Sequence, residues 1–275
     1  MLIMRIRITH QTTYRYSEPV KSAIQILRLT PGNHEGQTVL SWGIDADCDA
    51  RLMRREDWYG NVTHSLYAHG PVDLINLRVV GEIETTDTAG VIRGGVERFP
   101  EMFYLRNTPL TQIDAPMVEF AEAAAGHLSN PLEQAHALMG ELKARMRFDT
   151  EVTNATTAAA EAFSAGHGVC QDFTHVFLAA ARRLGIPARY VSGYLHRPDQ
   201  INQEAGHAWA EAHIGGLGWV SFDPTNAVSA TEHYVRIAVG LDYLDAAPVR
   251  GSYYGISREA LDVSLRIEGA RQAQA

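Results

Sequence analysis

The chain has 275 residues, of which 45% are hydrophobic, and its formal net charge at pH 7 is −8. This length allows one large domain or two smaller ones, and the hydrophobic share is ordinary for a globular protein with a core. The negative charge argues against a nucleic-acid binder, because such proteins present a basic surface. Two cysteines, Cys48 and Cys170, are too few for a disulfide framework, which favours a reducing compartment.

The N-terminal segment gives no sign of an export signal. Residues 1–7 alternate apolar and basic side chains, whereas a signal peptide needs an uninterrupted apolar run. No run of about eighteen apolar residues occurs, so we expect no membrane span. We therefore expect a cytoplasmic protein that binds neither membrane nor nucleic acid. No sequence pattern assigns an oligomeric state.

Residues 1–86 alternate apolar and polar side chains in short runs, which predicts β-strands. Expected strands include residues 38–47, 62–68 and 74–85, and turn-forming sequences such as Ser17-Glu18-Pro19 and His69-Gly70-Pro71 separate the runs. Short strands with regular breaks predict an N-terminal β-rich, sandwich-like module over residues 1–86. Residues 87–112 are interrupted by glycines and prolines, so we expect a linker with little structure of its own.

The composition changes at Asp114, where alanine- and leucine-rich segments with helical spacing begin. The expected helices are residues 115–125, 131–147, 157–163 and 173–184. The expected strands that follow are residues 188–195, 207–214, 218–223, 234–239 and 261–267. Helices followed by an antiparallel sheet predict an α+β core over residues 113–268, and the polar residues 269–275 are expected to be a frayed tail.

Cys170 directly precedes the apolar run of the last expected helix and follows Gly166 and Gly168. A free cysteine has a pKa near 8.5, and a helix N-terminus favours its thiolate form. The backbone N–H of Cys170 would also suit the oxyanion of an attacked carbonyl. The alternative reading is a buried structural thiol. Cys48 lies between Asp47 and Asp49, whose charges disfavour a thiolate, so we expect it to be inert.

A thiol nucleophile needs a base and a group that orients the base, and His207 and Asp223 follow Cys170 in that order. His207 begins an expected strand with alanines on one face, Ala208, Ala210 and Ala212, suited to lie against a helix. Taken alone, His207 is better explained as a core histidine, and Asp223 as a cap of the turn at Pro224. The combination of the three residues carries the hypothesis.

Other candidate sites are weaker. His207 and His213 are six strand residues apart, about 20 Å, which is too far to share a metal. Glu211 with His213 lacks a third ligand, and the sequence has neither a phosphate-binding loop nor an EF-hand loop. We therefore expect no metal or cofactor. His167 and His175, near Cys170, are expected to tune the site or to lie on the surface.

Three motifs together resemble the transglutaminase-like superfamily, a branch of the papain-like thiol enzymes. They are Gly168-Val169-Cys170, His207-Ala208-Trp209 and the run from Trp219 to Asp223-Pro224-Thr225. The resemblance covers about residues 130–226 and implies that Cys170 is the nucleophile, His207 the general base and Asp223 its orienter.

The flanking segments are similar to bacterial transglutaminase-like proteins with an N-terminal β domain. They are Asp57-Trp58-Tyr59-Gly60-Asn61, within the β-rich module, and the run from Gly240 to Gly251. One departure matters. Animal transglutaminases stabilise the oxyanion with a tryptophan upstream of the nucleophile, whereas Trp42 and Trp58 lie in the other module here. The second oxyanion donor is therefore unassigned, which puts crosslinking activity in doubt.

These observations predict a transglutaminase-like cysteine protease or amidohydrolase that cleaves an amide or isopeptide bond of a peptide or protein through an acyl-thioester on Cys170. The first alternative is a protein-glutamine acyltransferase, in which an amine replaces water as the acceptor. The second is a binding module that has kept the fold without catalysis, which the intact Cys170, His207 and Asp223 disfavour.

Overall fold

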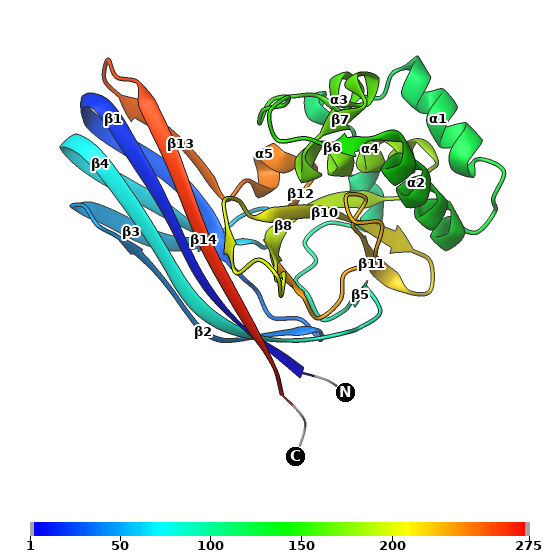
Figure 1. The fold of residues 1–275 in the computed structure, drawn as a ribbon, viewed down its shortest axis with the longest axis horizontal. Coiled ribbons are helices and arrows are strands. Elements are labelled where there is room, and N and C mark those ends of the chain that lie inside the picture. The colour runs from blue at the N-terminus through cyan, green and yellow to red at the C-terminus, as the bar shows by residue number, and fades with distance from the viewer. Residues whose placement is uncertain (1–2, 273–275) are drawn as a thin grey trace.

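The computed structural model describes residues 3–272, which form a tall curved sheet beside a smaller sheet covered by helices (Figure 1). The tall sheet is built from both ends of the described range, and Ile3 pairs with Gln272. Among the described residues, no helix has the length and apolar character needed to cross a membrane.

The tall sheet is organised around two long strands, β1 (Ile3–Thr30) and β4 (Val62–Thr86), which pair antiparallel along most of their length. β2 (Gln37–Ala46) and β3 (Ala50–Glu56) pair with successive parts of β4. β14 (Glu259–Gln272) and β13 (Val249–Tyr254) pair with successive parts of β1. Apolar side chains from both halves of the β1–β4 ribbon meet in one buried cluster, and this confirms the sandwich-like N-terminal module.

Two expected turns are instead irregularities inside these strands. Ser17-Glu18-Pro19 and His69-Gly70-Pro71 lie where the β1–β4 register shifts, and pairing continues on both sides of them. Each is a bulge that bends the ribbon, so the turn-forming residues mark the bend rather than an end of pairing.

The C-terminal part of the chain also differs from the expectation that residues 113–268 form the core and 269–275 a frayed tail. Residues 249–254 and 259–272 pair with β1, so they belong to the sheet of the N-terminal module. Gly269 pairs with Ile6, and of the expected tail only residues 273–275 lie outside the described range.

The remaining elements form the predicted α+β core. Its sheet has the antiparallel order β12 (Tyr234–Gly240), β8 (Ala188–Leu195), β10 (His207–Ile214), β11 (Gly218–Phe222) and β5 (Val91–Ile92). The helices are α1 (Ala115–Ala125), α2 (Pro131–Arg145), α3 (Ala159–Ala165), α4 (Cys170–Arg183) and α5 (Tyr243–Ala246). Short strands β6 (Arg147–Phe148) and β7 (His167–Gly168) complete it, whereas β9 (Asn202–Gln203) pairs with β14 and extends the tall sheet.

Helix α4 is the centre of this core. The alanine face of β10 is fully or nearly fully buried in the same apolar cluster as Val176 and Phe177 of α4, as its alternation predicts. Small side chains allow the helix to lie directly on the strand. Gly185, with φ of +79°, follows the helix in the left-handed conformation expected of a glycine cap.

The segment expected to be an unstructured linker, residues 87–112, holds β5 and two short 3-10 helices, η1 (Glu101–Leu105) and η2 (Pro109–Thr111). Tyr104 and Leu110 are buried, and the Arg182 guanidinium donates to the Tyr104 carbonyl and the Thr111 hydroxyl. The segment therefore packs on the core, even though its glycines and prolines interrupt every regular pattern in its sequence.

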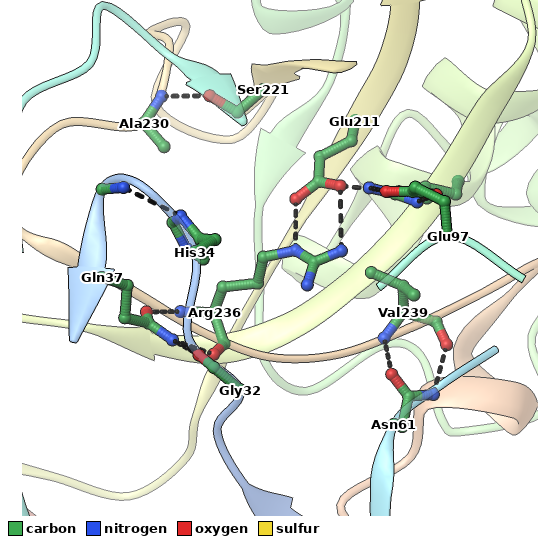
Figure 2. A network of polar contacts seen from close by, with 12 residues as sticks. Gly32, His34, Gln37, Asn61, Glu97, Glu211, Ser221, Ala230, Arg236 and Val239 are labelled. Carbon is green, nitrogen blue, oxygen red and sulfur yellow. Dashed lines mark hydrogen bonds and ion pairs between the residues drawn. The ribbon is translucent and has the colours of Figure 1, made fainter. Parts of the chain in front are cut away.

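Two side chains of the N-terminal module close the free edge of the core sheet. Gln37 exchanges two hydrogen bonds with the backbone of Arg236, at 2.8 and 2.9 Å, and Asn61 exchanges two with Val239, at 2.7 and 2.8 Å (Figure 2). Each side-chain amide thus forms the two hydrogen bonds that a further strand would form with the edge strand β12. The two modules are therefore joined by hydrogen bonds from side chains to the backbone as well as by apolar packing.

Candidate active site

Cys170 is the first residue of α4, and the chain before it is tightly constrained. Gly166 ends α3 with φ of +73°, and β7 then pairs in parallel with β6. The buried Asp172 carboxylate accepts hydrogen bonds from Val169 N at 2.8 Å and from Thr153 Oγ1 at 2.6 Å. A Cβ atom on Gly168 would lie 2.5 Å from Asp172 Oδ2, so only glycine fits there. The position of the thiol is therefore set by its surroundings.

The backbone N–H of Cys170 has no acceptor among residues 3–272. It belongs to the first turn of a helix, where N–H groups lack partners within the helix and the helix dipole is positive. A thiolate or a developing oxyanion at this position is stabilised by the same local field.

His207 and Asp223 meet as the sequence predicts. His207 Nε2 lies 2.6 Å from Asp223 Oδ2, and both side chains are buried. Since Nε2 faces the carboxylate, the other ring nitrogen, Nδ1, is left to interact with Cys170. The structure therefore brings together all three residues, from α4, the start of β10 and the end of β11.

Asp223 is surrounded by donors. Its Oδ2 accepts hydrogen bonds from Tyr234 Oη and Asn226 Nδ2, both at 2.7 Å, and its Oδ1 accepts from the backbone of Thr225 and Asn226. Burial raises the pKa of Asp223, but the hydrogen bonds from His207, Tyr234 and Asn226 outweigh it and leave the pKa below its ordinary value. The carboxylate is thus held ionised.

Burial lowers the pKa of His207, but the hydrogen bonds to Asp223 and Cys170 and their negative charges raise it to about 10. The imidazolium form is therefore favoured at neutral pH while Asp223 and a Cys170 thiolate face it. Such a pair of thiolate and imidazolium has a nucleophile and a proton donor in contact.

Cys170 and His207 lie on the wall of a cavity of about 410 Å³ between the two modules. The core contributes residues from α4, β8 and the loop that leads into β10, including Gln171, Tyr190 and Ser192. The N-terminal module contributes His10, Thr12 and Tyr14 of β1 together with Leu261 and Val263 of β14. A molecule bound at Cys170 would therefore touch both modules.

His10 links the cavity wall of β1 to the core. Its Nδ1 lies 2.8 Å from Tyr194 Oη and its Nε2 lies 3.0 Å from Thr12 Oγ1. Burial lowers the pKa of His10 to about 4, so the ring is neutral at physiological pH. This wall offers a substrate polar but uncharged groups.

Other residues singled out in the sequence have different surroundings. His175 is fully buried rather than on the surface, its Nε2 accepts from Tyr243 N at 3.0 Å, and burial lowers its pKa to about 3. His167 is half-buried, with Nδ1 3.7 Å from Asp149 Oδ2. For Cys48, burial and then the charges of Asp47 and Asp49 raise the thiol pKa, in keeping with an inert thiol.

Glu211 is part of a buried ion-pair network on the face of β10 opposite its alanines. Its carboxylate lies 2.6 Å from Arg189 Nε. It also lies 2.7 Å from Arg236 Nε (Figure 2). Burial alone raises the pKa of Glu211, but the two guanidinium charges lower it to about 2. Within residues 3–272, no group of three or more histidine, cysteine or acidic side chains is arranged to hold a metal ion.

The site also contains residues that the sequence did not indicate, namely Tyr234, Asn226 and Asp172. Asp172 is an acidic residue in the first turn of a helix, which is a recognisable capping signal. Tyr234 donates to Asp223 from eleven residues further along the chain, and no local pattern predicts that contact.

Comparison with known proteins places this geometry in a family. Residues 118–224 match the family described as the transglutaminase-like superfamily, and residues 6–84 match the bacterial transglutaminase-like N-terminal region.

An uncharacterised protein of Mycobacterium leprae is 31% identical over 96% of this chain and 98% of its own length. One from Mycobacterium bovis is 28% identical over 96% of this chain and 92% of its own. The crystal structure of a candidate cysteine protease from Cytophaga hutchinsonii has the same fold, with a TM-score of 0.78 and 23% identity over 99% of this chain and 92% of that one. The chain belongs to the transglutaminase-like superfamily, with the bacterial N-terminal region in front of the core.

Proposed function

We propose that the protein is a cysteine-dependent hydrolase that cleaves an amide or isopeptide bond of a peptide or protein through an acyl-thioester on Cys170. The observation that supports this most is the buried His207–Asp223 pair, 2.6 Å apart, which shares the wall of a cavity with Cys170. A structural thiol has no need of an ionised carboxylate behind a charged imidazole.

The chemistry follows from these contacts. The Cys170 thiolate attacks the carbonyl carbon and the π electrons move to oxygen, which gives a tetrahedral oxyanion. Collapse expels the amine, which takes a proton from the His207 imidazolium, and the acyl-thioester remains. Neutral His207 then takes a proton from water as the water attacks the thioester, and collapse releases the acid and the thiolate. Asp223 holds the imidazole in orientation in both halves.

Water is the acceptor that we favour, because the structural neighbour from Cytophaga hutchinsonii is described as a candidate cysteine protease. Acyl transfer to an amine is the alternative that the superfamily name supports. Both pass through the same thioester, so they differ only in the second half of the reaction.

Mass spectrometry of a glutamine-containing peptide, incubated with the protein with and without a primary amine, separates the two outcomes. We expect products of hydrolysis that appear at the same rate in both reactions. An amine adduct as the main product would show that the protein is an acyltransferase. A thiol-directed probe that labels wild type and Cys170→Ala equally, together with no turnover, would support a non-catalytic module.

A further inference from the structure

The proposed reaction needs a second hydrogen-bond donor for the oxyanion. Only residues that line the cavity can supply this donor. The Cys170 N–H supplies one donor, and neither tryptophan of the N-terminal module, Trp42 or Trp58, lines the cavity. Two or more donors aimed at the developing charge are the usual arrangement in acyl transfer. The remaining donor should therefore be a polar group on the cavity wall that has no partner within the protein.

Most polar groups on that wall are already engaged. Gln171 Nε2 donates to Asn154 O at 3.4 Å, and the Ser192 hydroxyl donates to Ala246 O at 2.7 Å. His10 and Thr12 bond each other, and His10 also bonds Tyr194. The polar side chains of the loop before His207, from Arg197 to Glu204, and the side chain of Thr150 are exposed or half-buried. This leaves the tyrosines Tyr14, Tyr190 and Tyr243.

None of the three tyrosine hydroxyls has a hydrogen-bond partner within the described part of the chain. Tyr14 belongs to the N-terminal module, and Tyr243 is only half-buried at the start of α5. Tyr190 is 1% exposed, and its ring packs against His175 of α4 at 5.2 Å between centroids. Of the three tyrosines, Tyr190 is therefore the most rigidly held, and it packs against the helix that carries Cys170.

The raised pKa of the Tyr190 hydroxyl is consistent with a hydrogen-bond donor at this position. Burial and then the charge of Cys170 raise the pKa of Tyr190 well above its ordinary value, so its hydroxyl keeps its proton. A fixed O–H without an internal partner on the cavity wall that also holds the thiol is able to donate as soon as negative charge develops, and no existing bond has to break.

We propose that Tyr190 is a catalytic residue whose hydroxyl is the second oxyanion donor, beside the Cys170 N–H. This assignment rests on the proposed function. When Cys170 attacks, the carbonyl π electrons move to oxygen, and that oxygen accepts hydrogen bonds from both groups. No proton is transferred in this step, and the charge returns to the carbonyl when the amine leaves.

Tyr190→Phe tests the assignment, with hydrolysis of a peptide ester as the readout. Loss of one oxyanion donor is expected to lower kcat by about 10²- to 10³-fold. KM should change by less than about threefold, because the substrate carbonyl gains little from the hydroxyl before charge develops. Affinity for a peptide aldehyde, which forms a hemithioacetal oxyanion on the thiol, should fall with kcat.

A purely structural role would give a different pattern. Alkylation of Cys170 by iodoacetamide forms no oxyanion, so its rate should stay within about twofold in Tyr190→Phe. Since the hydroxyl has no partner, Tm should also stay close to that of the wild type. Tyr104→Phe removes the hydroxyl of an equally buried tyrosine outside the cavity and should leave kcat unchanged.

Unchanged turnover in Tyr190→Phe overturns the assignment, as does a loss confined to Tyr243→Phe. If the alkylation rate and Tm of Tyr190→Phe fell together with kcat, Tyr190 would only support the fold. A wild type that turns over no acyl substrate, yet is alkylated normally, overturns the proposed function itself and this assignment with it.

Discussion

Asp223→Asn is the sharpest test of the pair behind the thiol. Every group that contacts the Asp223 carboxylate is a donor: the His207 ring, Tyr234, Asn226 and two backbone N–H groups. An asparagine can keep its oxygen toward the two backbone donors only by turning its NH₂ toward His207. Because that NH₂ is a donor, His207 Nε2 must become an acceptor and the ring proton must move to Nδ1, which faces Cys170. The base then already carries the proton that it should take from the thiol.

The size of the loss follows from the same contacts. The rise in the pKa of His207 to about 10 corresponds to about 5 kcal/mol if Asp223 supplied all of it. Cys170 contributes a share, and breaking a buried charge pair costs about 3–5 kcal/mol. We therefore take about 3 kcal/mol as the lower bound and about 5 kcal/mol as the upper bound for Asp223, which correspond to losses of about 10²- to 10⁴-fold in kcat/KM.

Two assays read this loss. Turnover of a peptide ester gives kcat/KM, and the rate of iodoacetamide alkylation at pH 6 gives the reactivity of the thiol without an acyl step. Both should fall in Asp223→Asn, and both should be unchanged in Asp73→Asn, which alters an exposed aspartate of the N-terminal module. Rates of turnover and alkylation within threefold of the wild type would refute the reasoning. A ring proton on Nδ1 would prevent His207 from accepting the thiol proton, and both rates depend on that transfer.

The other predictions concern the supports of the site. Tyr234→Phe removes one donor from Asp223 and should lower kcat/KM about tenfold, as measured on the same ester. Asn61→Ala leaves the buried N–H and C=O of Val239 unpaired and should lower the free energy of unfolding in urea by about 2–4 kcal/mol; a change below about 0.5 kcal/mol would contradict the edge-capping role. Because the pKa of His207 is raised, its contribution to stability is complete below about pH 6.5 and is lost as the pH rises through about 10. Urea titrations should show this decline in the wild type but not in His207→Gln.

The parts of the site that lie close together in the sequence could be predicted from it. The glycine-flanked Cys170 at a helix start and the alanine alternation of β10 are local patterns, and α4 begins and packs as they indicate. Local chemistry dictates them, because helix caps and strand alternation depend on neighbours within a few residues.

Contacts between distant segments could not be predicted in this way. The pairing of β14 with β1 joins the two ends of the chain, and alternation alone does not say which strand a strand will pair with. For the same reason the cavity wall made by His10 and Leu261 has no signal in the sequence. Glycine and proline favour bulges as well as turns, so the sequence does not distinguish the bulges in β1 and β4 from turns.

The central claim is that an acyl group passes through Cys170, and intact-mass spectrometry after rapid acid quench tests it directly. The protein is mixed with a peptide ester for less than one turnover time, and the adduct is located by peptide mapping. Cys48 serves as an internal control, because its thiol lies outside the cavity. We predict one acyl adduct on Cys170, absent in Cys170→Ala and slow to form in His207→Ala. Turnover that persists in Cys170→Ala, or acylation of Cys48 to the same extent, would contradict the claim.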